Sequence, residues 1–366
     1  MSKKFLIVGA GFYGATCARE LTDAGHHCTV IDKRSHIGGN CFTRYVEEAD
    51  CHEHHYGAHI FHTNSKRIWD YINRFATFNH YVNRVKVSHR ENIYSFPINL
   101  FTLYQVFGVK TPQEAVACLQ EKKERIEEPK NMEEWCLANV GREIYEIFIE
   151  GYSTKQWAKH PRELPASIIK RVPMRLNFDD NYFNDRFQGI PKGGYTSIFE
   201  KMLQGISLEL KVDFLQDRDA FLGKFDHVIF TGPIDSFFNY SLGHLEYRSL
   251  RFDHQLISCP DYQGNAVFNH TDAEVPYTRT YEHKHFDMNY SADRTAITFE
   301  YPQDWKPGKI EIYPVNTDEN QNLYAQYKEL TKEVPTVSFG GRLGQYRYYD
   351  MHQVIGSALE KVRSLA

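Results

Sequence analysis

The stretch that decides the fold is Phe5-Leu6-Ile7-Val8-Gly9-Ala10-Gly11-Phe12-Tyr13-Gly14. Its first four residues are apolar, which predicts a strand buried on both faces of a sheet. The G-x-G-x-x-G that follows leads into a helical pattern that ends near Gly25, and a second apolar run, Cys28 to Ile31, is closed by Asp32. Strand, glycine turn, helix, strand and acidic residue together form the complete fingerprint of a dinucleotide-binding unit.

Each glycine of the turn has its own task when a dinucleotide binds. Gly9 permits the tight turn, Gly11 lets the backbone approach a pyrophosphate, and Gly14 allows close packing of helix on strand. The free N–H groups at the helix start, together with the helix dipole, favour the anion. Asp32 can accept hydrogen bonds from an adenosine ribose and would repel a 2′-phosphate, so FAD or NAD is favoured over NADP.

Two further glycine pairs favour FAD over NAD. Gly38-Gly39-Asn40 follows the second strand, where flavoproteins with an extended FAD commonly carry basic residues and a glycine pair. Near the C-terminus, Val337-Ser338-Phe339 predicts a strand, and a glycine turn then leads to a helix that Asp350 could cap. No second G-x-G-x-x-G occurs in the sequence, so we expect no separate NAD(P)H domain.

Composition limits the class of protein. The 366 residues suggest two or three domains, and a net charge of −4 gives no basic excess for nucleic-acid binding. No apolar run approaches the roughly 18 residues of a membrane span. Seven cysteines without a C-x-x-C pair argue against a disulfide framework or a four-cysteine zinc site. With a start that reads as mature, we expect a cytoplasmic protein.

The middle of the chain divides into a helical and a strand-rich part. Helical patterns dominate from about 100 to 170. The charge-rich residues 121–134 are expected to form a solvated helix face that is broken near Pro129. Residues 213–216 and 226–230 are expected to be strands that return to the cofactor sheet. Alternating patterns from 245 to 315 predict an antiparallel sheet.

Two segments of the middle carry chemistry. Residues 50–64 hold five histidines, but the position four after His52 is Tyr56, so H-E-x-x-H is absent and we expect a flavin-facing loop without a metal. Tyr152 and Trp157 flank hydroxyls and the amide of Gln156, a set that could stack on a base and bind its edge. A core Trp at a helix end is the alternative.

These motifs resemble those of the prokaryotic UDP-galactopyranose mutases. The resemblance covers nearly the whole chain in order, and its later motifs are far more specific than the dinucleotide fingerprint. It is carried by Val8 to Gly14, Ile37 to Asn40, Tyr56 to Thr63, Gly151 to Trp157, Asn181 to Phe183, Gln188 to Pro191, Gly193 to Thr196, Thr231 to Asp235, Leu245 to Ser249, Val275 to Arg279 and Gly340 to Gln353. Ser153 departs from the threonine expected in many relatives, and both residues offer a hydroxyl.

The resemblance implies an α/β fold in which a Rossmann-like FAD-binding domain carries an inserted helical domain and an antiparallel β-sheet domain. The FAD-binding domain would comprise 1–80, 185–243 and 316–366. The helical, substrate-side domain would comprise 98–170. Residues 81–97, 171–184 and 244–315 would form the sheet domain.

The resemblance also implies the residues of the site, with no metal ligand among them. Catalysis would involve Arg171, Arg279 and His59. The substrate would be bound by Asn83, Phe148, Tyr152, Gln156, Trp157, Tyr182, Arg248, Tyr313 and Tyr348. The cofactor would be bound by Gly9, Gly11, Phe12, Gly14, Asp32, Lys33, Gly39, Asn40, His59, Arg342, Asp350 and Met351.

The implied reaction interconverts UDP-galactopyranose and UDP-galactofuranose, which supplies galactofuranose for cell-surface glycans. Reduced flavin N5 would attack the anomeric carbon, expel UDP and form a flavin iminium, with no net redox change. A homodimer is expected. The resemblance does not decide between galactose and its N-acetylated relative as the sugar of the substrate. One alternative is an FAD-dependent oxidoreductase of the amine-oxidase type, and another is a sugar-nucleotide sensor that uses the same pocket without turnover.

Overall fold

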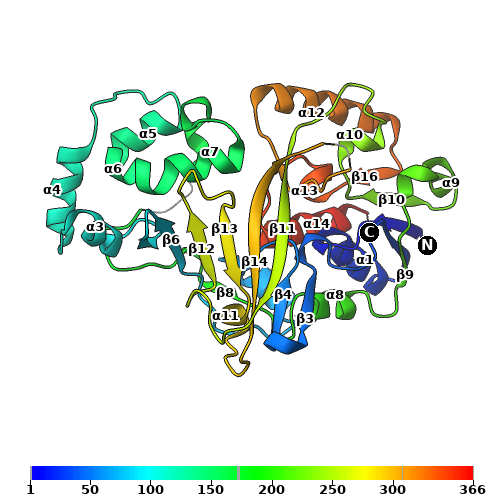
Figure 1. Cartoon of the computed structure of the whole chain (residues 1–366). Helices are drawn as coiled ribbons and strands as arrows, with labels where there is room; N and C mark the ends of the chain where they lie inside the picture. Colours follow the sequence, from blue (N-terminus) through cyan, green and yellow to red (C-terminus); the bar gives the residue numbers. More distant parts are fainter. Residues whose placement is uncertain (1, 171–173, 307, 366) are drawn as a thin grey trace.

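The computed structural model describes residues 2–170, 174–306 and 308–365. Figure 1 shows a helical lobe at the left, a tall sheet in the middle, and at the right a smaller sheet with helices packed around it. Within these ranges no helix is long and apolar enough to cross a membrane.

The smaller sheet is the predicted dinucleotide-binding unit, and its strands are parallel throughout. Their order is β16-β10-β1-β2-β9. The bounds are β1 (Lys4–Val8), β2 (His27–Asp32), β9 (Ser207–Leu210), β10 (His227–Phe230) and β16 (Val337–Phe339). The strand predicted at 226–230 is thus confirmed.

The strand predicted at 213–216 is wrong. Residues Phe214–Gln216 form the short 3-10 helix η6, because the side chain of Asp213 accepts a hydrogen bond from the backbone N–H of Leu215 and caps it. Phe214, only 2% exposed, packs into the core beside the sheet. The edge of the sheet is formed instead by Ser207–Leu210.

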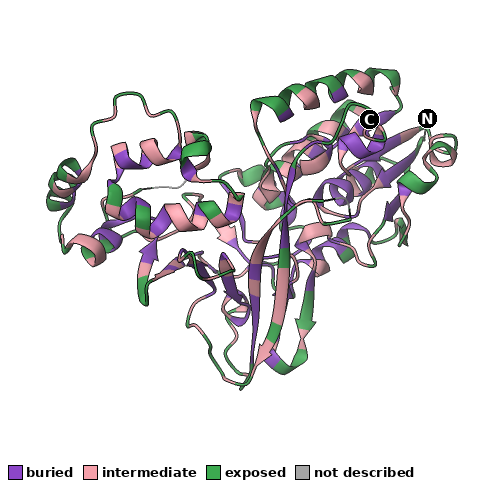
Figure 2. Ribbon diagram, turned by 45° about the horizontal axis from the view of Figure 1, so that its top comes forward, coloured by how far each residue is buried: buried purple, intermediate pink, exposed green. Residues whose placement is uncertain are grey.

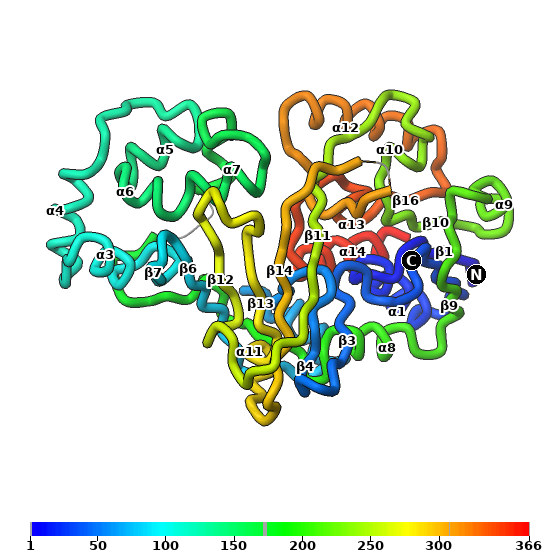
Figure 3. Tube along the Cα trace, in the orientation of Figure 1, coloured from blue at the N-terminus to red at the C-terminus, as the bar shows by residue number. Residues whose placement is uncertain are grey.

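Helices from both ends of the chain cover this sheet. Helix α1 (Phe12–Asp23) packs against α14 (Met351–Leu365), and α8 (Thr196–Met202) completes the apolar cluster on that side. Figure 3 shows the blue and red ends of the trace side by side. The first and last segments of the sequence therefore form one unit.

The tall sheet has the order β15-β11-β14-β13-β12-β6-β7. Its strands are β6 (Val85–His89), β7 (Asn92–Phe96), β11 (Tyr247–Ile257), β12 (Val267–His270), β13 (Arg279–Glu282), β14 (Thr295–Asp304) and β15 (Tyr313–Pro314). Its pairs are antiparallel as predicted, except that β6 and β12 run parallel. These two strands belong to separate hairpins, so no tight turn imposes an antiparallel pairing.

The helical lobe is inserted between β7 and the segment before Tyr182. It contains α3 (Leu100–Phe107), α4 (Pro112–Lys122), α5 (Met132–Asn139), α6 (Arg142–Tyr145), the π-helical turn η3 (Glu146–Glu150), α7 (Gly151–Trp157), η4 (Pro161–Glu163) and η5 (Ala166–Ile168). Thr111 begins α4 with a capping box. In Figure 2 the outer helices α4 and α12 (Asp318–Leu330) show largely exposed residues.

The helix face predicted over 121–134 is broken at Pro129 as expected, but the interruption is far longer than predicted and leaves 123–131 outside any helix. Helix α4 ends at Lys122, since Lys123 adopts an extended conformation, with φ −66° and ψ 137°. The backbone N–H of Glu124 then donates to the carbonyl of Leu137 in α5, so a tertiary bond replaces the next helical one. Residues 124–131 therefore cross between two helices.

Shorter elements connect these parts. They are η1 (Gly39–Cys41), β3 (Thr43–Val46), η2 (Glu47–Ala49), β4 (Cys51–His54), β5 (Phe61–Thr63), α2 (Lys66–Ile72), β8 (Phe187–Gly189), α9 (Arg218–Leu222), α10 (Ile234–Phe237), α11 (Lys284–Asp287), η7 (Thr331–Glu333) and α13 (Gly341–Gly344). Strands β3 and β4 pair with each other, and so do β5 and β8.

Candidate functional site

The two glycine turns meet backbone to backbone beyond β1. Gly9 has a φ of +110°, and a Cβ added at Gly14 would lie 1.9 Å from the carbonyl oxygen of Gly9. A Cβ added at Gly39 would lie 3.2 Å from the Cα of Gly11. Side chains at these positions would close the approach, so this concave backbone surface fits a pyrophosphate.

Asp32 ties its own strand to the first glycine turn. Its Oδ2 accepts from the backbone N–H of Ala10 at 2.8 Å, and its Oδ1 accepts from the N–H of Arg34 at 2.9 Å. The guanidinium of Arg34 donates through Nη2 to Asn40 and lies 4.7 Å from the ring centroid of Tyr56. Its Nη1 is buried and has no hydrogen-bond partner within the described chain, so it is available to a polar ligand.

Two other predicted cofactor residues differ in exposure. Lys33 is exposed, whereas the side chain of Phe12 is 5% exposed and packs against Phe199, with the ring centroids 4.6 Å apart. The core contact of Phe12 leaves its backbone, at the start of α1, as the part that can face a ligand.

The histidine loop leads from β4 toward the cofactor region. The backbone N–H of His59 donates to Nδ1 of His54 at 3.0 Å, and Nδ1 of His59 lies 2.8 Å from the carbonyl of Gly57. Burial lowers the pKa of His59 to about 4 and that of His54 well below its ordinary range. Both imidazoles are therefore neutral at pH 7.

The remaining histidines of the loop point to different partners. Nδ1 of His52 binds Asp287, the ring of His55 stacks on His254, and Nδ1 of His62 binds Asp185 at 2.5 Å. They do not converge on one point. The expectation of no metal site stays a prediction, because ligand atoms of His62, Asp350 and His352 lie within 4.8 Å of one another.

A small cavity of about 90 Å³ lies between the helical lobe and the tall sheet. It brings together eight residues predicted to bind or transform substrate, from the π-helical turn and α7, the segment after residue 180, β13, β15 and the residues before α14. They are Phe148, Tyr152, Gln156, Trp157, Tyr182, Arg279, Tyr313 and Tyr348.

Arg279 is the cation of this cavity. Its guanidinium carbon lies 5.5 Å from the ring centroid of Tyr152, and its Nε donates to Oδ1 of Asn269 at 3.3 Å. Nη1 lies 3.7 Å from Oε1 of Glu300, a carboxylate only 1% exposed that also accepts from the hydroxyl of Tyr281. Sequence reasoning missed Glu300 and Asn269. The sequence pattern gave no signal for Glu300, because it takes a regular polar position in the alternation Ile297 to Tyr301 and looks like a solvent-facing residue.

A tyrosine pair closes the other end of the cavity. The rings of Tyr313 and Tyr348 stack with centroids 5.4 Å apart, and the guanidinium of Arg342 lies 5.6 and 5.1 Å from them. Arg342 also donates to the carbonyls of Ile312 and Tyr349. Burial raises the pKa of Tyr313, so its hydroxyl stays protonated and can donate to an anion.

Unpaired polar atoms line the helical side. The hydroxyl of Tyr152 and Oε1 of Gln156 are buried without hydrogen-bond partners in the part of the chain that the structure describes. Gln156 is only 9% exposed. Buried polar atoms in this state are costly unless a ligand pairs with them, which fits a polar, aromatic-sized group between α7 and β13.

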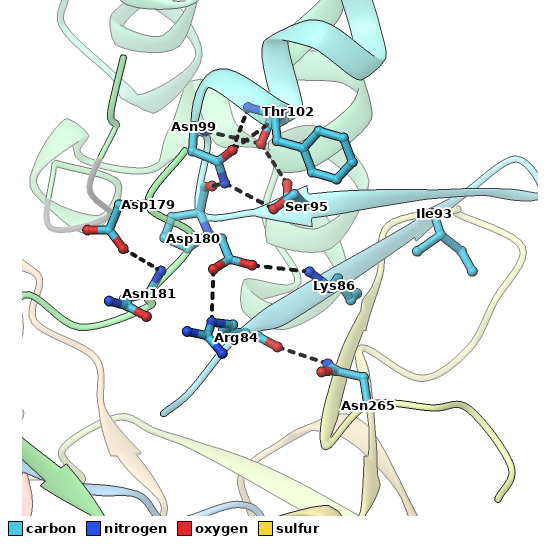
Figure 4. A network of polar contacts seen from close by, with 12 residues as sticks. Arg84, Lys86, Ile93, Ser95, Asn99, Thr102, Asp179, Asp180, Asn181 and Asn265 are labelled. Atoms are coloured by element: carbon cyan, nitrogen blue, oxygen red, sulfur yellow. Dashed lines mark hydrogen bonds and ion pairs between the residues drawn. The ribbon is translucent and has the colours of Figure 1, made fainter. Parts of the chain in front are cut away.

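Ion pairs hold Tyr182 at the cavity. Oδ1 of Asp180 lies 2.9 Å from Nε of Arg84, and its Oδ2 lies 3.4 Å from Nζ of Lys86 on β6 (Figure 4). The backbone N–H of Tyr182 then donates to the carbonyl of Asn83 at 2.8 Å. Asn83 contributes through this carbonyl, whereas its side chain accepts from Tyr81 and lines neither cavity.

Other predicted residues lie outside this cluster. Arg248 lines a larger neighbouring cavity of about 580 Å³, where it donates to the carbonyl of Gln156 and pairs with Asp304. Trp157 and Tyr348 line both cavities. Arg171 falls outside the described residues. Asp350 and Met351 stand at the start of α14, beside the glycine turn of α13.

Known proteins resemble this chain over nearly its whole length. A family model described as UDP-galactopyranose mutase matches residues 147–348, and one described as an NAD(P)-binding Rossmann-like domain matches residues 7–75. The chain is 42% identical to a probable UDP-galactopyranose mutase of Klebsiella pneumoniae, over 98% of this chain and 94% of that protein. It is 38% identical to a dTDP-fucopyranose mutase of Escherichia coli, over 98% of this chain and 97% of that protein.

Solved structures show the same fold. The crystal structure of a reduced UDP-galactopyranose mutase matches with a TM-score of 0.76 and 15% identity, covering 100% of this chain and 95% of that chain. A putative protoporphyrinogen oxidase from Exiguobacterium matches with a TM-score of 0.61 and 12% identity, covering 100% of this chain and 99% of that chain. At these identities the likeness concerns the fold alone, and the predicted α/β architecture is confirmed.

Proposed function

Because this chain belongs to the UDP-galactopyranose mutase family, and is therefore an isomerase, we propose that it interconverts UDP-galactopyranose and UDP-galactofuranose with bound FAD. The observation that carries the substrate class is Arg279, which faces Tyr152, Tyr313 and Tyr348 in one cavity. A part-buried cation that shares a cavity with three tyrosine side chains suits a diphosphate.

The glycine turns at Gly9 to Gly14 and at Gly38-Gly39 would bind the FAD pyrophosphate through backbone N–H groups. Asp32 would accept hydrogen bonds from the adenosine ribose. Arg34 offers its unpaired Nη1 to the same ligand. Gly39 and Asn40 would bind the FAD beside Arg34. At the flavin ring of the cofactor, Arg342, Asp350 and Met351 would lie on one side and the neutral imidazole of His59 on the other. When bound, reduced FAD supplies a nucleophilic N5 for the anomeric carbon.

The protein's own residues would bind and retain UDP. Ring contraction breaks the C1–O5 bond and closes through O4, so UDP must leave C1 and stay nearby until it returns. Arg279 would stabilise the charge of the departing diphosphate, and Tyr313 and Tyr348 would donate hydrogen bonds to it. Gln156 and Tyr152 carry buried unpaired oxygens in the described chain, and these would meet the donors of the uracil and ribose.

We propose the predicted domain division together with this function. All five strands of the smaller sheet come from 1–80, 185–243 and 316–366, and the seven strands of the tall sheet come from 81–97 and 244–315, which supports it. The helices α3 to α7 fall within 98–170. The proposal includes a cytoplasmic homodimer, on the ground of the family resemblance alone.

The test of the proposed function should include a dTDP-sugar as a second substrate. The relative from Escherichia coli, 38% identical, is a dTDP-fucopyranose mutase. The holoprotein should therefore be incubated with UDP-galactofuranose and, in parallel, with dTDP-fucofuranose, each with and without dithionite. The proposal expects conversion of the UDP sugar, only after reduction. Preference for the dTDP sugar would assign the second function, and stoichiometric oxidation of either sugar would instead identify an oxidoreductase.

A further inference from the structure

Lys155 stands on α7 between residues of the candidate site but lines neither cavity. Its side chain reaches the turn that joins β12 to β13. There Nζ donates to four backbone carbonyls, those of His270 at 2.8 Å, Asp272 at 2.8 Å, Val275 at 3.0 Å and Tyr277 at 3.1 Å. An ammonium has three N–H donors, so four oxygens fully occupy it.

The backbone of α7 touches the same turn one helical turn earlier. A Cβ added at Gly151 would lie 2.0 Å from the carbonyl oxygen of Thr271. Residues 151 and 155 are four apart and therefore share one face of the helix. Through this face α7 is held directly against the turn, which Figure 1 shows beneath α7 at the tips of β12 and β13.

Both sides of this contact carry residues of the site. The turn is preceded by Asn269 and followed by Arg279, which bind each other and line the small cavity. The adjacent face of α7, about 100° around the helix, presents Tyr152 and Gln156 to that cavity. The ammonium of Lys155 thus connects the helix that would bind the nucleoside to the strand pair that would bind the diphosphate.

The carbonyls hold an ion and not a neutral amine at pH 7. Burial lowers the pKa of Lys155 to about 8, and the nearby Asp272 and Glu274 act in the opposite direction. The carboxylate of Asp272 accepts from the backbone N–H of Arg90 at 3.0 Å, which holds the turn from its far side. His89 lies 3.5 Å from the same carboxylate.

We propose that Lys155 is a positioning residue for nucleotide binding: its ammonium, bound to the carbonyls of 270–277, sets the separation between α7 and β13. The inference rests on the proposed function and adds a residue that touches no ligand. Lys155 takes no part in the contacts of Arg279 with Glu300 and Asn269, so its loss should weaken ground-state binding more than it slows the chemical step.

The test compares Lys155→Met with Lys284→Met. Lys284 is 3% exposed and, like Lys155, donates to a backbone carbonyl, that of Pro260, and lines neither cavity. In Lys155→Met the dissociation constant for UDP and the KM for the nucleotide sugar should rise by about 10- to 100-fold, as expected for a small displacement of binding groups. The kcat should change by less than about threefold, and amides of 271–278 should exchange hydrogen faster. Lys284→Met should leave the KM unchanged.

Failure of this inference differs from failure of the proposed function. If the wild-type holoprotein neither binds UDP nor forms product, the proposed function fails. If it does both, and Lys155→Met retains the wild-type KM and UDP affinity, the positioning role is overturned. Should Lys155→Met not fold, Asp272→Ala loosens the same turn from the Arg90 side: a raised KM supports the inference, and an unchanged KM contradicts it.

Discussion

The guanidinium of Arg279 lies over the ring of Tyr152, 5.5 Å from its centroid, so a strand of the tall sheet and a helix of the inserted lobe meet at one cation. Both side chains line the small cavity. The pairing places positive charge beside an aromatic helix turn, an arrangement that fits a nucleoside diphosphate.

Arg279→Ala should lower kcat as well as weaken UDP binding. A charge-assisted contact contributes roughly 1.5–3 kcal/mol, so kcat/KM should fall on the order of 10- to 150-fold. Steady-state kinetics with UDP-galactofuranose measure this. Arg251→Ala is the matched control. Arg251 also lies over an aromatic ring, that of Tyr301, but it is an exposed residue of β11 that lines neither cavity. Equal losses in both variants would contradict the assignment.

Glu300→Gln should make the protein less stable but more strongly stabilised by UDP. The carboxylate of Glu300 partly neutralises the guanidinium of Arg279. The Gln substitution removes this negative charge and leaves the part-buried guanidinium without a carboxylate partner. The diphosphate would then become the main counter-charge. Thermal melts with and without UDP should show a lower Tm for the variant and a larger UDP-induced rise than in the wild type. An unchanged rise would show that Glu300 does not act on the ligand site.

Trp157→Ala should weaken UDP binding by about 10-fold, since stacking on a base contributes about 1–3 kcal/mol. Trp157 lines both cavities and is only partly buried against the lobe core. Trp135→Ala provides the control, because Trp135 packs on the same core and lines neither cavity. Isothermal titration with UDP measures the affinity. If Trp157→Ala costs several kcal/mol of stability and binds UDP normally, the core-Trp alternative is correct.

Stability should fall as the pH drops below about 6.5. Burial lowers the pKa of His54 well below its usual range, that of His59 to about 4 and that of His283 to about 3. Below pH 6.5 the unfolded chain takes up these protons while the folded chain does not, so the folded state loses about 1.4 kcal/mol per histidine per pH unit. Denaturant melts between pH 7 and 5 should show this slope. Stability independent of pH in that window would mean that these imidazoles are not held neutral.

The sequence predicted the dinucleotide-binding unit well because its glycines report backbone geometry directly. Gly9 takes a positive φ and Gly14 touches a carbonyl, and few other residues could occupy either position. The edge strand Ser207–Leu210 was missed because it is mostly exposed and lacks the apolar run of a buried strand. Local capping by Asp213 likewise overrides the strand pattern just after it.

The site was predictable in its aromatic and basic residues but not in its supporting contacts. Glu300 stands opposite Arg279 only through the register of β13 on β14, which residue spacing does not reveal. Arg248 belongs to a matching motif, yet its side chain turns to the carbonyl of Gln156 and to Asp304. A motif places a residue on the correct strand, and only packing decides which cavity its side chain enters.

The central claim is a sugar-ring isomerisation without net redox change, and product analysis with UDP-galactofuranose tests it most directly. The holoprotein is incubated anaerobically with the substrate, with dithionite in one arm and none in the other. UDP-galactopyranose should accumulate over many turnovers in the reduced arm, and hardly at all in the oxidised arm. Full conversion with oxidised flavin, or no conversion by reduced protein that demonstrably binds UDP, would contradict the account.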